Sequence, residues 1–279
     1  MHFVHSFWTK PYETNRWYMN DTITTKANVL LYTLSFLYLK SLNQKVVLYT
    51  DDKGKELLDF IPYDEIYLTL NDIPQDNPVM LWAQGKMYAM KNEPLDAVHI
   101  DADVMIMKNE CIEKIKKELY DNDALVQHIQ LDEFKAQYIS PMHINYPEGI
   151  SPNEKDSVNN GILAFNNQNL KDTFLNTYFN TLTQIKNNEY LKSLYENDKY
   201  FAPDLVVEQR FLYDIIKRDN YTIGTILGIT KKSTMADDEL GYLHYCGKRK
   251  FKIIQFLKQE INKLNPEIYN KAIDKLKQI

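Results

Sequence analysis

The first hundred residues alternate short apolar runs with segments of helical periodicity, and this alternation restricts the fold more than any other feature of the sequence. Apolar runs that predict strands occupy residues 2–7, 45–50, 64–70 and 97–100. Segments that predict helices lie between them, over residues 23–42, 53–60 and 80–92. Strands that alternate with helices form a mostly parallel sheet with helices on both faces. The sequence therefore predicts an α/β fold, with ligands bound beyond the carboxyl ends of the strands.

The remainder of the chain adds elements to this pattern without an internal repeat or a linker. Further strands are predicted over residues 124–129, 161–167 and 222–227, and further helices over residues 169–188 and 202–219. Residues 140–160 are rich in Pro, Asn and Ser and predict a long loop of the kind that is usually functional or mobile. Two amphipathic helices close the chain. We expect one domain over residues 1–251, with a helical extension over residues 252–279 packed on or beside it.

Composition and charge exclude several classes of function. The 279 residues are 44% hydrophobic and 25% charged, as in ordinary globular proteins, and a net charge of -5 argues against nucleic acid as a partner. Lys and Arg outnumber acidic residues from Lys248 onward, which predicts either a solvated helix face or peripheral contact with anionic lipid.

Two cysteines, Cys111 and Cys246, do not make a disulfide framework and suggest a reducing compartment. No secretory signal is visible, and the longest apolar run, residues 27–39, is too short to span a bilayer. We therefore expect a cytoplasmic protein, with peripheral contact at the inner face of the membrane as an added possibility.

The segment "HIDADVMI" places two carboxylates between two apolar runs. Asp101 and Asp103 follow the predicted strand 97–100, so they lie at the edge of the sheet where ligands bind. An ionised carboxylate without a partner is costly to bury, and two of them can converge on one hard divalent ion such as Mg²⁺ or Mn²⁺. Acidic residues two apart also occur in solvated turns, but the apolar runs on both sides favour the metal site.

Three other segments contain side chains suited to the same chemistry. In "HYCGKRK", His244 could complete a metal shell, while Gly247 and Lys250 suit a phosphate; alone, the segment also fits a surface histidine beside a basic cluster. Glu208 is either a solvated helix residue or a carboxylate directed at a reacting carbon. Asn160-Gly161 before a strand is either a turn or the place where an amide meets a sugar.

In this order the segments resemble the GT-A class of nucleotide-sugar glycosyltransferases, above all its glycogenin-like and lipopolysaccharide-galactosyltransferase-like branch. The matching motifs are a DxD at residues 101–103, an Asn-x-Gly at residues 159–161, an acidic-Gln pair at Glu208-Gln209 and a His-x-x-Gly-x-x-Lys at residues 244–250. A basic residue on the helix before the DxD is also typical of the class, and Lys86 occupies that place. The resemblance covers roughly residues 1 to 252.

The resemblance implies a role for each matching residue. The implied metal ligands, for Mn²⁺ or Mg²⁺, are Asp101, Asp103 and His244. The implied contacts to the nucleotide sugar are His5, Ser6, Trp8, Asp51, Lys86, Asn160, Gly161, Gly247 and Lys250. The implied catalytic residues, near the anomeric carbon, are Glu208 and Gln209.

The implied activity is a metal-dependent hexosyl transfer from a nucleoside-diphosphate sugar, with UDP as the expected carrier, to a glycan, lipid-linked or protein acceptor. Retention of configuration and a place in bacterial glycan synthesis are the expectations from the family. The sequence departs from the family pattern at Glu208, where Asp is usual, at Phe251-Lys252, which replace Pro-Trp, and in a loop over residues 140–158.

Two alternatives remain. A sugar-nucleotide pyrophosphorylase would carry a Gly-rich loop after the first strand, and "VHSFWTKPYETN" has no Gly. A non-catalytic protein that binds nucleotide sugar or carbohydrate would retain the fold without turnover.

Overall fold

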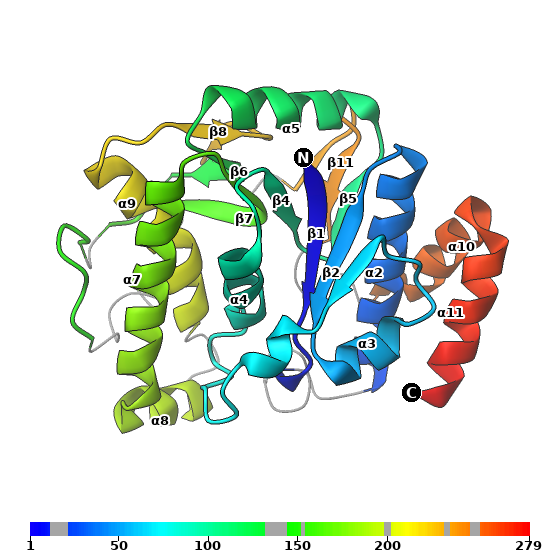
Figure 1. The fold of residues 1–279 in the computed structure, drawn as a ribbon, viewed down its shortest axis with the longest axis horizontal. Helices are drawn as coiled ribbons and strands as arrows, with labels where there is room; N and C mark the ends of the chain where they lie inside the picture. The colour runs from blue at the N-terminus through cyan, green and yellow to red at the C-terminus, as the bar shows by residue number, and fades with distance from the viewer. Residues whose placement is uncertain (12–21, 132–143, 152–153, 198–201, 232–234, 246–251) are drawn as a thin grey trace.

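In the computed structural model, which describes residues 1–11, 22–131, 144–151, 154–197, 202–231, 235–245 and 252–279, eight described strands form one mixed sheet (Figure 1). The strands are β1 (His2–Phe7), β2 (Val46–Thr50), β3 (Glu65–Tyr67), β4 (Ala97–Ile100), β6 (Ala124–Gln130), β7 (Ser157–Phe165), β8 (Ile223–Thr225) and β9 (Ile229–Thr230). Their order is β3-β2-β1-β4-β7-β6-β8, and β9 also pairs with β6. Among these strands only β7 runs against the others. The predicted α/β class with a mostly parallel sheet is confirmed.

Helices cover both faces of the sheet (Figure 1). The described α-helices are α2 (Thr22–Ser41), α3 (Asp52–Leu58), α4 (Gln84–Asn92), α5 (Asn109–Asp121), α7 (Gln168–Lys186), α8 (Glu189–Asn197), α9 (Phe211–Arg218), α10 (Ile254–Leu264) and α11 (Pro266–Gln278). One hydrophobic core joins the sheet to α2, α5, α10 and α11, and a second joins it to α4, α7 and α9. The apolar residues of α2 are buried on nearly every side, which is the pattern of a core helix.

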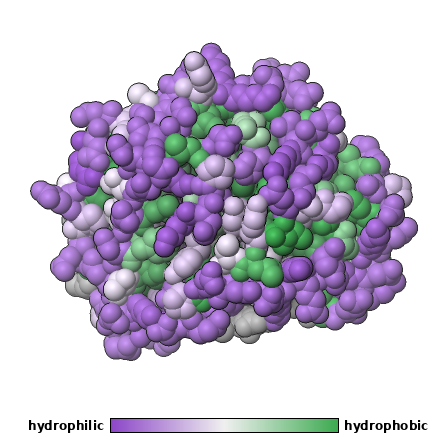
Figure 2. Space-filling model, in the orientation of Figure 1, coloured by the Kyte–Doolittle hydropathy of each residue, from purple (hydrophilic) through white to green (hydrophobic). Residues whose placement is uncertain are grey.

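The two C-terminal helices pack against α2. Leu257 and Ile261 of α10 are fully buried, and they belong to the same core as α2. The predicted helices are therefore confirmed, while the division into residues 1–251 and 252–279 stays a prediction. Figure 2 shows a mostly hydrophilic face, with apolar side chains gathered near α10 and α2.

Several lysines of the two described C-terminal helices lie beside carboxylates. Four lysines of this segment form ion pairs, namely Lys263, Lys271, Lys275 and Lys277. Peripheral contact of this segment with anionic lipid stays a prediction. Within the part of the chain that the structure describes, no helix combines the length and apolar character needed to cross a membrane.

A second, three-stranded sheet brings distant parts of the chain together. It consists of β10 (Ala236–Asp237), β11 (Tyr242–His244) and β5 (Val104–Ile106), paired antiparallel in that order. His244 pairs with Val104, directly after the two aspartates. This pairing, which the sequence did not predict, sets His244 beside the DxD turn.

Some of the predicted elements differ from those in the structure. β7 begins at Ser157, because residues predicted as loop pair with the end of β6 despite the low strand propensity of Asn. β3 ends at Tyr67, and Thr69–Asp72 form a 3₁₀ turn. The predicted helix over residues 202–219 contains a π-helical turn, Leu205–Arg210, that leads into α9. Such a turn widens the backbone spiral, and side-chain periodicity does not reveal it.

Candidate metal and nucleotide site

The candidate site lies at the carboxyl edge of the parallel strands. Asp101 follows β4 directly, and the turn that it begins is closed by a hydrogen bond from Val104 N–H to its carbonyl oxygen, 3.0 Å long. The Asp101 N–H donates to the Gly161 carbonyl of β7 at 3.0 Å. The turn is therefore fixed to the sheet on one side and to β5 on the other.

Two carboxylates and one imidazole converge at this turn. Ligand atoms of Asp101, Asp103 and His244 all lie within 4.8 Å of one another. His244 Nε2 faces Asp103 Oδ1 at 3.3 Å, and His244 Nδ1 lies 2.7 Å from Gln127 Oε1. Because an amide oxygen only accepts, Nδ1 carries a proton, and Nε2 is left as the metal-binding atom.

The pair formed by His244 Nε2 and Asp103 Oδ1 needs a positive charge between its two atoms. Both are acceptors when the imidazole is neutral, so only a proton or a cation makes their approach favourable. The Tyr242 hydroxyl donates to Gln127 Oε1 at 2.8 Å, which fixes the amide that orients His244. Oxygen ligands with one imidazole suit Mn²⁺ or Mg²⁺, so these residues fit a divalent cation.

Gly161 gives the imidazole its space. A Cβ at this position would lie 2.3 Å from Gln127 Oε1 and 2.8 Å from His244 Cε1 and Nδ1. The structure thus gives Gly161 a steric role beneath His244. Its contact with the sugar stays a prediction.

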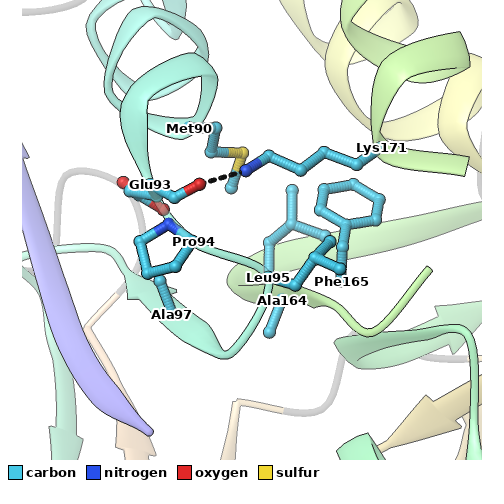
Figure 3. A pocket seen from close by; sticks show the side chains of 9 residues that line it. Met90, Glu93, Pro94, Leu95, Ala97, Ala164, Phe165 and Lys171 are labelled. Atoms are coloured by element: carbon cyan, nitrogen blue, oxygen red, sulfur yellow. Dashed lines mark hydrogen bonds between the residues drawn. The ribbon is translucent and has the colours of Figure 1, made fainter. Parts of the chain in front are cut away.

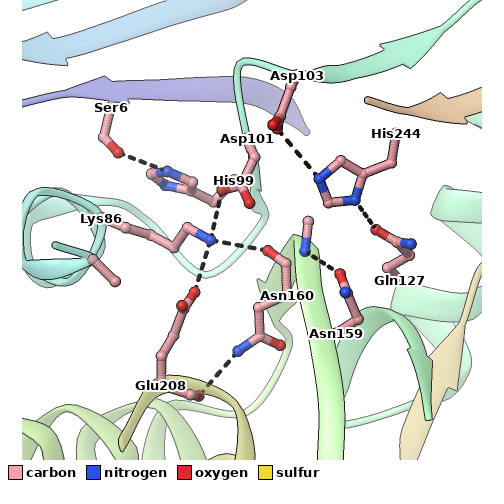
Figure 4. A network of polar contacts seen from close by, with 12 residues as sticks. Ser6, Lys86, His99, Asp101, Asp103, Gln127, Asn159, Asn160, Glu208 and His244 are labelled. Carbon is pink, nitrogen blue, oxygen red and sulfur yellow. Dashed lines mark hydrogen bonds and ion pairs between the residues drawn. The ribbon is translucent and has the colours of Figure 1, made fainter. Parts of the chain in front are cut away.

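Lys86 is the centre of a buried polar network on the other side of the turn (Figure 4). Its ammonium group lies 2.7 Å from Asp101 Oδ1, 2.8 Å from Glu208 Oε1 and 2.9 Å from the Asn160 carbonyl oxygen. An ammonium group has three N–H donors, so these acceptors account for all of them. Burial lowers the pKa of Lys86, but Asp101 and Glu208 outweigh burial and leave that pKa raised. Lys86 therefore stays charged and joins Asp101 to Glu208.

Glu208 lies in the π-helical turn that precedes α9, fully enclosed beside Lys86. Burial and the charge of Asp101 raise the pKa of Glu208, while Lys86 opposes them. Asp204, one turn earlier, accepts from Ala83 N–H and from the Tyr178 hydroxyl. Burial, and then Glu208, raise the pKa of Asp204 well above its usual value. On this side of the site, several carboxyl groups therefore lie close to one lysine.

Asn160 is hydrogen-bonded to the backbone of the π-helical turn that contains Glu208. Its Nδ2 donates to the Glu208 carbonyl oxygen at 3.0 Å. Its Oδ1 is buried, and among the described residues it has no hydrogen-bond partner. The predicted sugar contact through Asn160 remains a prediction, and the unpaired acceptor is compatible with it.

The residues predicted to contact the nucleoside differ in their burial and in their hydrogen-bond partners. His5 is fully buried between the Tyr63 hydroxyl and Ser35 Oγ, and burial lowers its pKa to about 3. Both ring nitrogens of His5 thus lie beside protein hydroxyl groups, and its contact with the nucleotide sugar stays a prediction. Trp8 is buried against Leu70.

Asp51 begins α3 as its N-cap. It accepts from Gly54 N–H at 2.7 Å and from the backbone and hydroxyl of Thr9 at 2.8 Å. Ser6 and Gln209 are partly exposed. The two remaining predicted contacts, Gly247 and Lys250, lie outside the described residues.

Sequence reasoning missed the residues that support the predicted ligands. Gln127 and Tyr242 orient His244, and His99 with Glu93 stands beside Lys86. The signal was present: a polar Gln inside the apolar run "ALVQHI" and a His inside "AVHI" both need partners in a buried strand.

Comparison with known proteins adds a family and a distant structural likeness. The crystal structure of mouse xyloside xylosyltransferase 1 in its apo form is 13% identical, with a TM-score of 0.39 over 81% of this chain and 83% of that chain. A likeness at this level decides nothing about activity. No curated protein matches the sequence significantly. A family model described as a family of unknown function (DUF6734) matches residues 1–275, and the chain belongs to that family.

Proposed function

We propose that this protein is a metal-dependent glycosyltransferase that uses a nucleoside-diphosphate sugar as donor. One observation carries the proposal: Asp101, Asp103 and His244, far apart in the sequence, bring their ligand atoms within 4.8 Å of one another at the carboxyl edge of the sheet. In open α/β sheets this edge is where ligands bind. The order of the sequence motifs supports the same activity.

Each part of the site has a task in this reaction. A divalent ion held by Asp101, Asp103 and His244 would neutralise charge on the departing nucleoside diphosphate. Lys86 orients Asp101 through their 2.7 Å contact and so fixes one wall of that cradle. Gln127 fixes the tautomer of His244 and keeps Nε2 directed at Asp103.

Glu208 and Gln209 are the proposed catalytic residues. Glu208 is held by Lys86 and enclosed, which suits a group that stabilises positive charge on the sugar better than a base open to the acceptor. Gln209 is partly exposed beside it. We therefore propose retention of configuration, UDP as the carrier, and a glycan, lipid-linked or protein acceptor.

The test is a binding and turnover assay with Mn²⁺ and a panel of nucleotide sugars. We expect Mn²⁺-dependent binding of one nucleoside diphosphate and slow hydrolysis of the matching sugar donor. Asp103→Ala should abolish the metal-dependent binding and leave the thermal unfolding temperature close to that of the wild type. Asp121→Ala, at an exposed position at the end of α5, is the matched control and should bind as the wild type does.

Three outcomes would contradict the proposal. Absence of binding and turnover with every donor in the panel would remove the transferase assignment. Binding without turnover, with acceptors of all three classes supplied, would indicate a binding protein instead. Formation of nucleoside triphosphate from pyrophosphate and a nucleotide sugar would identify a pyrophosphorylase.

A further inference from the structure

Ser6, His99 and Glu93 form a continuous hydrogen-bonded line from the site edge into the interior. The Ser6 Oγ lies 3.0 Å from His99 Nε2, and His99 Nδ1 lies 3.0 Å from Glu93 Oε1. The His99 and Glu93 side chains are only 1% and 3% exposed, whereas Ser6 is partly exposed. Figure 4 shows Ser6 and His99 beside Lys86 and Asp101. Ser6 is thus the outer end of the line.

The inner end of the line is fixed by the backbone. Glu93 is the C-cap of α4, and its N–H donates to the Met90 carbonyl oxygen at 3.3 Å. Its own carbonyl oxygen accepts from Lys171 of α7, across the small pocket shown in Figure 3. This pocket lies at the opposite end of β4 from Asp101, so Glu93 is anchored outside the metal site.

This arrangement sets the positions of the protons when the His99 ring is neutral. A carboxylate only accepts, so the hydrogen bond between Glu93 and His99 requires a proton on His99 Nδ1. In the neutral ring, Nε2 is then an acceptor, and the Ser6 hydroxyl must donate to it. The Ser6 hydroxyl oxygen can then accept a hydrogen bond from a ligand through its lone pairs.

We propose that His99 and Glu93 are positioning residues that hold Ser6 as a hydrogen-bond acceptor for the nucleoside of the donor. The inference rests on the proposed function, because Ser6 lies near the carboxyl end of β1, at the same edge of the sheet as Asp101, where that function binds its donor. The group recognised is a hydrogen-bond donor: either a ribose hydroxyl or the ring N–H of a base such as uracil. The Ser6 hydroxyl selects for such a donor because its own proton is already committed to His99.

The proton positions are tested directly by ¹⁵N NMR of the His99 ring. We expect the Nδ1–H tautomer in the wild type. In Glu93→Gln, the amide can donate to Nδ1, and the ring proton should move to Nε2 with the fold intact. Glu110→Gln, at an exposed position in the first turn of α5, is the matched control and should leave the His99 signals unchanged. A wild-type ring protonated on Nε2 would overturn the proposal.

The ligand contact is tested by calorimetric binding of UDP in the presence of Mn²⁺. Loss of one neutral hydrogen bond predicts that Ser6→Ala and Glu93→Gln each weaken UDP binding roughly 3- to 10-fold, and that the double variant is no weaker than Ser6→Ala. The two sources of the donor group are separated by 2′-deoxy-UDP, which lacks one ribose hydroxyl, and by CDP, whose base has no N3–H. Ser6→Ala should abolish the wild-type preference for UDP over one of these two.

Different failures have different meanings. Wild-type protein that binds no nucleoside diphosphate would remove the proposed function, while the NMR experiment would still decide whether Glu93 sets the tautomer. Normal UDP binding by the wild type and by Ser6→Ala alike would overturn the inference and leave the proposed function standing. Covalent labelling of Ser6 by a fluorophosphonate would also overturn it, because a Ser-His-Glu line can activate a nucleophile.

Discussion

Replacing Gly161 with Ala tests whether the imidazole of His244 depends on the space beneath it. The added Cβ would lie 2.3 Å from Gln127 Oε1 and 2.8 Å from two atoms of the His244 ring. All three separations are too short for real contacts, so the amide and the ring must both move. Because Gln127 is the group that orients His244, the variant should lose the hydrogen bond between them.

The size of the effect follows from these contacts. Overpacking costs about 1–3 kcal/mol, and the lost hydrogen bond about 1 kcal/mol. A loss of about 2–4 kcal/mol lowers the melting temperature of a protein of this size by about 4–10 °C. Displacing the partner that orients a metal-binding His typically costs about 10- to 100-fold in metal affinity.

The assays are thermal unfolding and calorimetric titration with Mn²⁺, each compared with Gly224→Ala. A Cβ at Gly224 in β8 would lie 2.8 Å from the Glu118 carbonyl oxygen and 2.9 Å from Asn122 Nδ2, away from the site. This control should lose stability by a similar amount and bind Mn²⁺ as the wild type does. The reasoning is refuted if Gly161→Ala keeps wild-type Mn²⁺ affinity, or if both variants lose it equally.

Three further changes test the surrounding charges and hydrogen bonds. Lys86→Met should lower the free energy of unfolding in urea by about 3–5 kcal/mol, because it leaves the buried Glu208 carboxylate without its cation. Adding Glu208→Gln should recover part of that loss, and no recovery would mean that Glu208 is not destabilised by the change. Burial raises the pKa of Asp214 to about 6, so the folded state binds its proton more tightly than the unfolded chain, and this residue's contribution to stability falls as pH rises from about 4 to 6. The free energy of unfolding of Asp214→Asn in urea, relative to that of the wild type, should therefore rise by about 1–2 kcal/mol between pH 4 and pH 7, which is less than the full pKa shift because solvent screens part of the interaction. A difference that does not change with pH would contradict this prediction. Tyr242→Phe removes the 2.8 Å bond to Gln127 and should weaken Mn²⁺ binding about 3- to 10-fold with little change in fold, whereas unchanged affinity would show that Gln127 does not need it.

The sequence predicts the elements of this fold better than it predicts their pairing. Alternating apolar runs located β1, β2, β4 and α2 closely, because burial on both faces leaves a continuous hydrophobic signal. The direction of β7 is not encoded in such a run, since the same residues can pair parallel or antiparallel. The apolar run of β5 stood out beside the aspartates, whereas β11 carries too few residues to do so, and the pairing of the two became visible only in three dimensions.

The candidate site, too, was predicted only in part from the sequence. Asp101 and Asp103 could be named because carboxylates are costly in apolar surroundings unless they have a partner. His244 was named from the resemblance of its segment to a known motif. The burial of His5 could not be foreseen, because Ser35 and Tyr63, which satisfy its ring, come from other elements. The contact of Lys86 with the sugar stays a prediction. The structure adds three protein acceptors around its ammonium group, which spacing in the sequence does not reveal.

The reversed direction of β7 has a consequence for how the family can diversify. β6 ends and β7 begins at the edge that carries Asp101, so the chain leaves the sheet after β6 and re-enters it at β7 beside the candidate site. Part of this connection is tied to α9, through Arg218 to the Glu148 carbonyl oxygen and through Lys217 to Glu154. Insertions or deletions between these ties leave every strand register intact. The chain between β6 and β7 can therefore vary in length beside the candidate site while the paired strands keep their register.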